Sequence, residues 1–82
     1  MKVNFKKITY KEVDIDFQKI FDFIVSENKY QNPADIAEHF EYNSIEYLLK
    51  THDLDEFSLH NDENNNVVDD IVNEFYDWVE NK

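Results

Sequence analysis

Carboxylate and amide side chains before the last apolar segment are the nearest approach in this chain to a metal-binding motif. Asp62, Asn64 and Asn66 alternate as the first three ligands of a calcium loop do. However, Val67 stands where the sharp turn of that loop needs glycine, and Asn73 stands where a bidentate glutamate should be. We therefore interpret the stretch as a solvated loop, in which we expect the most mobile backbone, and not as a calcium site.

Residues for enzymatic catalysis are not arranged in any recognisable motif. The chain has no cysteine and no glycine, which excludes a cysteine nucleophile and a glycine-rich phosphate loop. The three histidines lack the spacing of zinc ligands and are interpreted as surface or boundary residues: His39, His52 and His60. Carboxylates are so numerous that no pair stands out as a general acid and base. We therefore expect no enzymatic activity, no cofactor and no bound metal.

Negative charge is the feature that remains, and it is unevenly distributed. The chain has 19 acidic residues against 8 lysines and a net charge of −11. Four of the lysines lie within residues 1–11, so residues 12–82 carry all 19 acids and only 4 lysines. Such a surface repels nucleic acid and anionic lipid, and it favours cations or basic proteins as partners. The alternative is that the charge serves solubility alone.

The spacing of apolar residues over 66–82 predicts an amphipathic helix, since successive residues lie about 100° apart. One arc is apolar and is predicted to face the core: Val68, Ile71, Val72, Phe75, Trp78 and Val79, with Tyr76 at its edge. The opposite arc is polar and almost purely anionic: Asp69, Asp70, Asn73, Glu74, Asp77 and Glu80. The rest of the fold is predicted to pack around the apolar arc.

The acidic arc of this helix is the predicted partner-binding site. Its five carboxylates span a rise of about 16 Å, or one per ~3–4 Å, close to the ~3.4 Å axial spacing of charges on one DNA strand. The pattern does not favour stability, because Asp70 and Glu74 repel at i,i+4. The predicted site comprises Asp69, Asp70, Glu74, Asp77 and Glu80, joined by Asp62 and Glu63. The alternative is a solvated face without a partner.

The N-terminal part is predicted to form a short arm followed by a helix. Residues 1–8 alternate weakly and are interpreted as a short strand or an extended arm. A capping-box pattern at Thr9 predicts a helix over 10–28. Its apolar stripe comprises Val13, Phe17, Ile20 and Ile24, widened by Tyr10, Phe21 and Val25. Ile15 and Phe23 fall outside that stripe, and we expect the N-terminal arm to cover them.

Two shorter helices are predicted in the middle of the chain. Asn32, Pro33 and Asp35 form a start signal for a helix over 33–41. A cap-like pair then predicts the next helix over 44–52. The apolar residues that these two helices are expected to bury are Ile36, Ala37, Phe40, Ile45, Leu48 and Leu49.

Together these patterns predict a single domain over residues 1–82. Its fold class is mostly α, a compact bundle of about four helices with a short N-terminal arm or strand. A short helical turn is predicted within 53–59 and a polar loop over 60–66. The centre of the core is predicted to comprise Phe17, Ile20, Leu48, Phe75 and Trp78. No apolar run is long enough to cross a membrane and no signal-peptide pattern is present, so we expect a cytoplasmic protein.

Residues 32–53 weakly resemble a helix-turn-helix motif in their apolar spacing. Glu41 replaces the usual turn glycine in this segment. The helix that would enter the DNA groove offers Lys50 as its single lysine, too little for the phosphate contacts that dominate DNA affinity. Direct binding of nucleic acid is therefore not expected.

In size, charge and helix content the whole chain resembles small acidic phage-encoded anti-defence inhibitors, the anti-CRISPR and anti-restriction proteins that mimic DNA. It is also similar in these respects to the small acidic immunity proteins that neutralise nuclease toxins. The resemblance includes no residue motif, so it carries over no functional residue. It implies a non-enzymatic inhibitor of a nucleic-acid-binding defence enzyme, such as a CRISPR effector or a restriction enzyme. The alternatives are an immunity protein or antitoxin against a cognate toxin, and an accessory protein of a mobile element.

Overall fold

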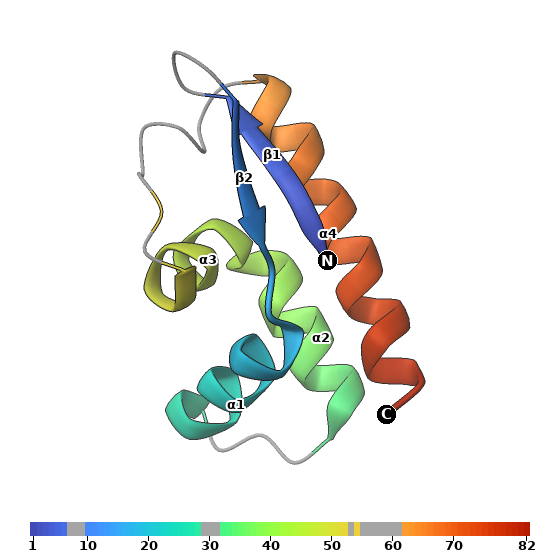
Figure 1. Cartoon of the computed structure of the whole chain (residues 1–82). Coiled ribbons are helices and arrows are strands. Elements are labelled where there is room, and N and C mark those ends of the chain that lie inside the picture. The colour runs from blue at the N-terminus through green and yellow to red at the C-terminus, as the bar shows by residue number, and fades with distance from the viewer. Residues whose placement is uncertain (7–9, 29–31, 53, 55–61) are drawn as a thin grey trace.

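The computed structural model describes residues 1–6, 10–28, 32–52, 54 and 62–82, which form a hairpin and four helices. In chain order the elements are β1 (Lys2–Lys6), β2 (Tyr10–Asp14), α1 (Phe17–Asn28), α2 (Pro33–Tyr42), α3 (Ser44–His52) and α4 (Asp62–Glu80). The hairpin lies alongside α4, α2 packs on α4, and α1 packs on α2 and α3 (Figure 1). The predicted fold class, a mostly α bundle with a short N-terminal strand, is confirmed.

The weak alternation of apolar and polar residues at the N-terminus belongs to a strand, β1. β1 pairs with β2 antiparallel, with Val3 opposite Val13. Val3 and Phe5 are buried, whereas Lys2, Asn4 and Lys6, which alternate with them, are exposed. A two-stranded hairpin is marginal by itself, so this hairpin depends on the cover that α4 gives its apolar side.

The helix predicted over 10–28 is wrong in its first turns, because α1 begins at Phe17. β2 has few apolar residues that a helix could bury. Its pairing with β1 provides hydrogen-bond partners for its backbone N–H and C=O groups, while its carboxylates stay in solvent. The actual cap is Asp16, whose carboxylate accepts the Lys19 N–H at 3.1 Å. Thr9 itself lies outside the described residues, but the helix start predicted from its capping-box pattern is wrong, because Tyr10–Asp14 is a strand.

The two apolar residues outside the predicted stripe have different neighbours. Ile15 is 2% exposed and belongs to the same core cluster as Val3 and Phe5 of the N-terminal arm. Its backbone N–H donates to the Met1 carbonyl at 2.6 Å. Phe23 packs edge-on against Tyr47 of α3, with ring centroids 5.8 Å apart. Its predicted cover by the arm is wrong, because α1 turns this side chain toward α3.

α2 and α3 occupy the predicted segments to within one residue. The Asn32 side chain accepts the Ala34 N–H at 3.0 Å and Pro33 takes the first helical position, which confirms the start signal. Asn43 alone separates the two helices, and its side-chain amide donates to the His39 carbonyl at 3.0 Å. Because a helix-turn-helix motif needs a turn of three to four residues, the weak resemblance to that motif is wrong.

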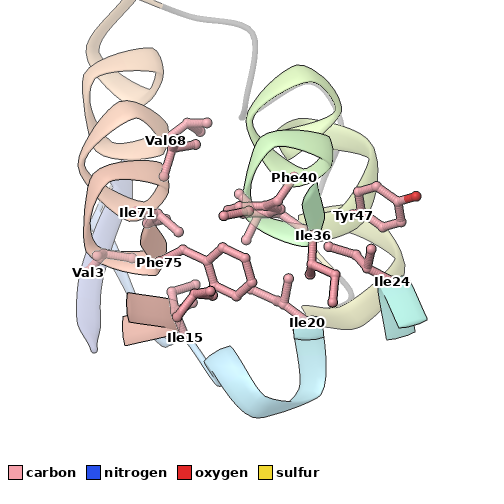
Figure 2. Close-up of a cluster of buried hydrophobic side chains, with 14 of the residues drawn as sticks. Val3, Ile15, Ile20, Ile24, Ile36, Phe40, Tyr47, Val68, Ile71 and Phe75 are labelled. Atoms are coloured by element: carbon pink, nitrogen blue, oxygen red, sulfur yellow. The ribbon is translucent and has the colours of Figure 1, made fainter. Parts of the chain in front are cut away.

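The core forms where α1, α2 and α4 meet, with Phe75 of α4 near its centre (Figure 2). The Phe75 ring lies 4.8 Å from that of Phe40 on α2. Of the predicted core residues, Ile20, Leu48 and Phe75 are fully buried, whereas Phe17 and Trp78 are partly buried. The apolar residues predicted on α2 and α3 all belong to this core: Ile36, Ala37, Phe40 and Leu48 are buried, and Ile45 and Leu49 are partly buried.

α4 begins at Asp62, so the loop predicted over 60–66 is wrong from residue 62 onward. Asn64 in this segment is fully buried. Its Nδ2 donates to the Lys6 carbonyl, and its Oδ1 accepts the Lys6 N–H, both at 2.8 Å. The amide thus pairs with the edge of β1 as a neighbouring strand would, and the polar alternation up to Asn66 belongs to a helix and not to a calcium loop.

The segment between α3 and α4 and the length of the helices bear on two further predictions. The helical turn predicted within 53–59 lies outside the described residues except for Leu54. Leu54 is partly buried and packs against the core. In the described segments, no helix combines the length and the apolar character needed to cross a bilayer.

Candidate functional site

α4 presents the predicted acidic arc to solvent. The polar residues of that arc are all exposed: Asp69, Asp70, Asn73, Glu74, Asp77 and Glu80. Helical geometry spreads them over about 140°, and the other side of the helix buries residues such as Ile71 and Phe75, both 0% exposed. We refer to Asp69, Asp70, Glu74, Asp77 and Glu80 as the α4 acidic face.

The carboxylates of the α4 acidic face form no ion pair or hydrogen bond with any described residue. Three lysines of the described segments pair with carboxylates outside this face: Lys2 with Glu12, Lys6 with Glu63, and Lys50 with Glu46. Lys82, which follows the face in sequence, directs its ammonium to Oε1 of Gln18 at 3.1 Å and not to a carboxylate. Five negative charges therefore remain uncompensated along one side of a helix.

The two remaining predicted site residues lie at the beginning of α4. Helical periodicity places both Asp62 and Glu63 on the same arc as the α4 acidic face. Glu63 is exposed, and its carboxylate lies 3.4 Å from the Lys6 ammonium of β1. The side chain of Asp62 lies outside the described residues. This end of the arc is therefore partly neutralised by the hairpin.

Carboxylates of α2 border the α4 acidic face, a feature that the sequence did not predict. The Tyr76 hydroxyl donates to Oε2 of Glu41 at 2.7 Å and so links the two helices. Burial, assisted by this hydrogen bond, raises the pKa of Tyr76 to about 12, which keeps the phenol protonated as a donor. Tyr42, next to Glu41 in sequence, is 77% exposed. The anionic surface thus extends from α4 onto α2.

Aromatic rings border the other edge of the α4 acidic face. Trp78 was predicted as a core residue but is partly buried. Its ring centroid lies 6.1 Å from Phe17, 5.8 Å from Phe21 and 5.9 Å from Phe75. The Lys82 ammonium lies 4.8 Å from the centroids of both Phe21 and Trp78. The Lys82 cation therefore lies against two partly buried aromatic rings at this edge.

His52 joins the end of α3 to the beginning of α1. Its Nε2 accepts the Asp16 N–H at 2.9 Å, and its Nδ1 lies 2.6 Å from Oγ1 of Thr51. The Thr51 hydroxyl donates its own proton to the Tyr47 carbonyl at 2.7 Å, so its oxygen accepts the proton on Nδ1 of His52. Because Nε2 is an acceptor and therefore carries no proton, the ring is neutral. Burial first, and then the Lys19 ammonium, lower the pKa of His52 below its ordinary value.

His39 is the other histidine within the described residues, and it contacts Tyr47. His39 is partly buried, and its Nε2 lies 2.7 Å from the Tyr47 hydroxyl. The interpretation of His39 and His52 as boundary residues is thus confirmed, whereas His60 lies outside the described residues. Across the described segments, no three His, Asp or Glu side chains come together as metal ligands.

Comparisons of the chain with protein-family models, with curated proteins and with solved structures found no match. Function is therefore inferred from the surfaces of the molecule itself. Of these surfaces, helical periodicity predicts the α4 acidic face. The Glu41–Tyr76 link and the rings around Trp78 arise from contacts between helices, for which the sequence offers no local signal.

Proposed function

We propose that this protein is a non-enzymatic inhibitor that occupies the basic channel of a nucleic-acid-binding enzyme, such as a CRISPR effector or a restriction enzyme, in the cytoplasm of a bacterial host. The observation that carries the proposal is the α4 acidic face, whose exposed carboxylates have no partner among the described residues. A channel lined with lysine and arginine for the phosphates of DNA offers the complementary charge.

The rigidity of α4 supports this function. Its apolar side is buried through Ile71 and Phe75, and its first turn is tied to β1 through Asn64. The charges are therefore held in a fixed order before a partner binds, which limits the conformational entropy lost on association. Four intervals over a rise of about 16 Å give a mean axial spacing of ~4 Å per charge, near the ~3.4 Å on one strand of DNA.

A second row of carboxylates on α2 also supports a nucleic-acid-like surface. The hydrogen bond from Tyr76 holds Glu41 beside α4, and Glu38 lies one turn earlier on the same helix. Both residues are exposed. Carboxylates on both α2 and α4 spread the negative charge over a surface and not only along one line. A channel that binds a nucleic acid is complementary to such a surface.

A charge-neutralised variant separates this function from solubility alone. The partner is first captured from a bacterial lysate and identified by mass spectrometry. Asp70→Asn, Glu74→Gln and Asp77→Asn, made together, should then slow association with it about tenfold or more at low salt and weaken the salt dependence. The fold should remain intact, because these side chains are exposed and their mutual repulsion is relieved.

A matched control removes three charges elsewhere. Glu27→Gln, Asp35→Asn and Glu46→Gln alter exposed carboxylates on α1, α2 and α3. This control variant changes the net charge equally but should retain most of the affinity. Equal losses of affinity in the two variants would mean that net charge, and not the α4 acidic face, governs binding.

The exposed ring of Tyr42 favours a second candidate, an immunity protein or antitoxin that binds a toxin through an aromatic anchor. Tyr42 is 77% exposed and is the last residue of α2, directly after Glu41 and one turn beyond Glu38. Tyrosine is enriched among residues that dominate binding energy in protein interfaces. For this candidate, Tyr42→Ala should reduce affinity for the captured partner more than the three substitutions on α4 do.

A further inference from the structure

We propose that Phe21 and Trp78 form a binding site for an arginine or lysine side chain of a basic protein partner, and that Lys82 is its internal occupant. We call this pair of rings the aromatic corner. The two rings meet at 65°, with centroids 5.8 Å apart, so they form two walls of a corner and not a flat stack. The site is contributed by α1 and by the last turn of α4.

The position of Lys82 shows which chemistry the aromatic corner accepts. Its Nζ lies 4.8 Å from both ring centroids, well within the ~6 Å range of cation–π attraction. Oε1 of Gln18 accepts a hydrogen bond from the same ammonium at 3.1 Å. Two aromatic faces and one amide oxygen therefore surround a cation. This ammonium makes no ion pair with a described carboxylate, so the rings and the amide hold it.

Space and charge next to the aromatic corner favour a larger cation from another protein. Trp78 also borders an open cleft of about 530 Å³, together with Met1, Asp14, Ile15, Asp16, Phe17 and Gln18. Asp14 and Asp16 line the cleft, where the Asp14 carboxylate lies 3.4 Å from the Met1 ammonium and the Asp16 carboxylate caps α1. Glu74 lies one helical turn before Trp78. A planar guanidinium can stack on the indole and bind a carboxylate at the same time, which an ammonium does less well.

The same charges argue against other occupants. A second copy of this chain carries a net charge of −11 and is repelled, as are nucleic acid and anionic lipid. A partner with clustered arginine and lysine is attracted both to the cleft and to the adjoining α4 acidic face. The inference thus deepens the proposed function, since it names a side-chain contact with the same class of partner.

The test uses short peptides and needs no identified partner, so its failure and that of the proposed function are distinguishable. Wild-type protein and a Lys82→Met variant are titrated at 0.15 M salt with acetyl-Gly-Arg-Gly-amide. The citrulline peptide, which lacks the charge, is the matched control. Trp78 is the single tryptophan of the chain, so its indole N–H signal in NMR spectra and its fluorescence both report on the aromatic corner.

The arginine peptide should shift the Trp78 signals saturably and should bind Lys82→Met about two- to fivefold more tightly than wild type, because the internal competitor is gone. The citrulline peptide should bind more weakly by a similar factor. Adding Phe21→Leu to Lys82→Met removes one wall but no acidic residue, so it should weaken binding and thereby exclude a general attraction to the acidic surface. Equal binding of the two peptides, or no gain on removing Lys82, or no loss with Phe21→Leu in a folded protein, would each overturn the inference.

Discussion

Replacing Asn64 by alanine tests how the hairpin is attached to the helices. Asn64 is fully buried and makes two hydrogen bonds of 2.8 Å to the backbone of Lys6, 58 positions away in sequence. The substitution removes both bonds and leaves a void where the amide was. The hairpin then loses a polar attachment to α4 and retains its apolar contacts through Val3 and Phe5.

The magnitude follows from what is lost. A typical hydrogen bond contributes about 1 kcal/mol net, and a buried group that loses its partner costs about 1–3 kcal/mol. Two bonds therefore place the loss in the free energy of unfolding for Asn64→Ala at about 2–4 kcal/mol. A domain of this size has a total stability of roughly 4–12 kcal/mol, and each kcal/mol shifts Tm by ~4–8 °C, so Tm should fall by roughly 10–30 °C.

Urea and thermal denaturation followed by circular dichroism measure this loss. Asn65→Ala is the matched control, because Asn65 is exposed one position along the same helix. Hydrogen exchange of the Lys6 amide gives a local readout and should accelerate in Asn64→Ala beyond the global loss of stability. If Asn64→Ala and Asn65→Ala agree within about 0.5 kcal/mol, the attachment described here is wrong.

Three further predictions concern the other contacts between elements. The folded-state pKa of His52 is lowered, so the folded protein binds fewer protons than the unfolded chain, and stability should be complete above pH ~6.5 and fall as the pH drops below that value. His52→Gln, whose amide oxygen can still accept the Asp16 N–H, should flatten that part of a Tm-against-pH profile. Asp16→Ala should lower the free energy of unfolding, measured by urea denaturation, by about 1 kcal/mol through the loss of a helix cap. Glu12→Gln, which changes the glutamate of the Thr9–Glu12 pattern first interpreted as a capping box, should change it by no more than about 0.5 kcal/mol. Phe75→Ala should lower the free energy of unfolding by about 3–5 kcal/mol and Trp78→Ala by less, because only Phe75 is fully buried. The reverse order of these losses in urea denaturation would contradict the packing.

The parts of the fold that the sequence predicted correctly are those with local signals. Asn32 and Pro33 specify the beginning of α2 through their own side chain and ring, without reference to distant residues. The two arcs of α4 follow from periodicity, because a helix that buries Ile71 and Phe75 must expose Asp70 and Glu74. The α4 acidic face could therefore be located before the structure was known.

The parts that the sequence did not predict depend on contacts between distant segments. β2 contains residues compatible with a helix, and only its pairing with β1 makes it a strand. The first turn of α4 looks like a polar loop until Asn64 meets the Lys6 backbone. The aromatic corner likewise needs Phe21 of α1 beside Trp78 of α4, and no spacing along the chain indicates that contact.

Competition with DNA on the captured partner tests the central proposal most directly. A labelled DNA duplex is bound to that partner and followed by fluorescence anisotropy while this protein is added. If the α4 acidic face occupies the nucleic-acid channel, the protein should displace the duplex completely. The Asp70→Asn, Glu74→Gln, Asp77→Asn variant should require a concentration at least about tenfold higher for the same displacement. A ternary complex, in which the partner holds DNA and this protein simultaneously with unchanged affinities, would contradict the account.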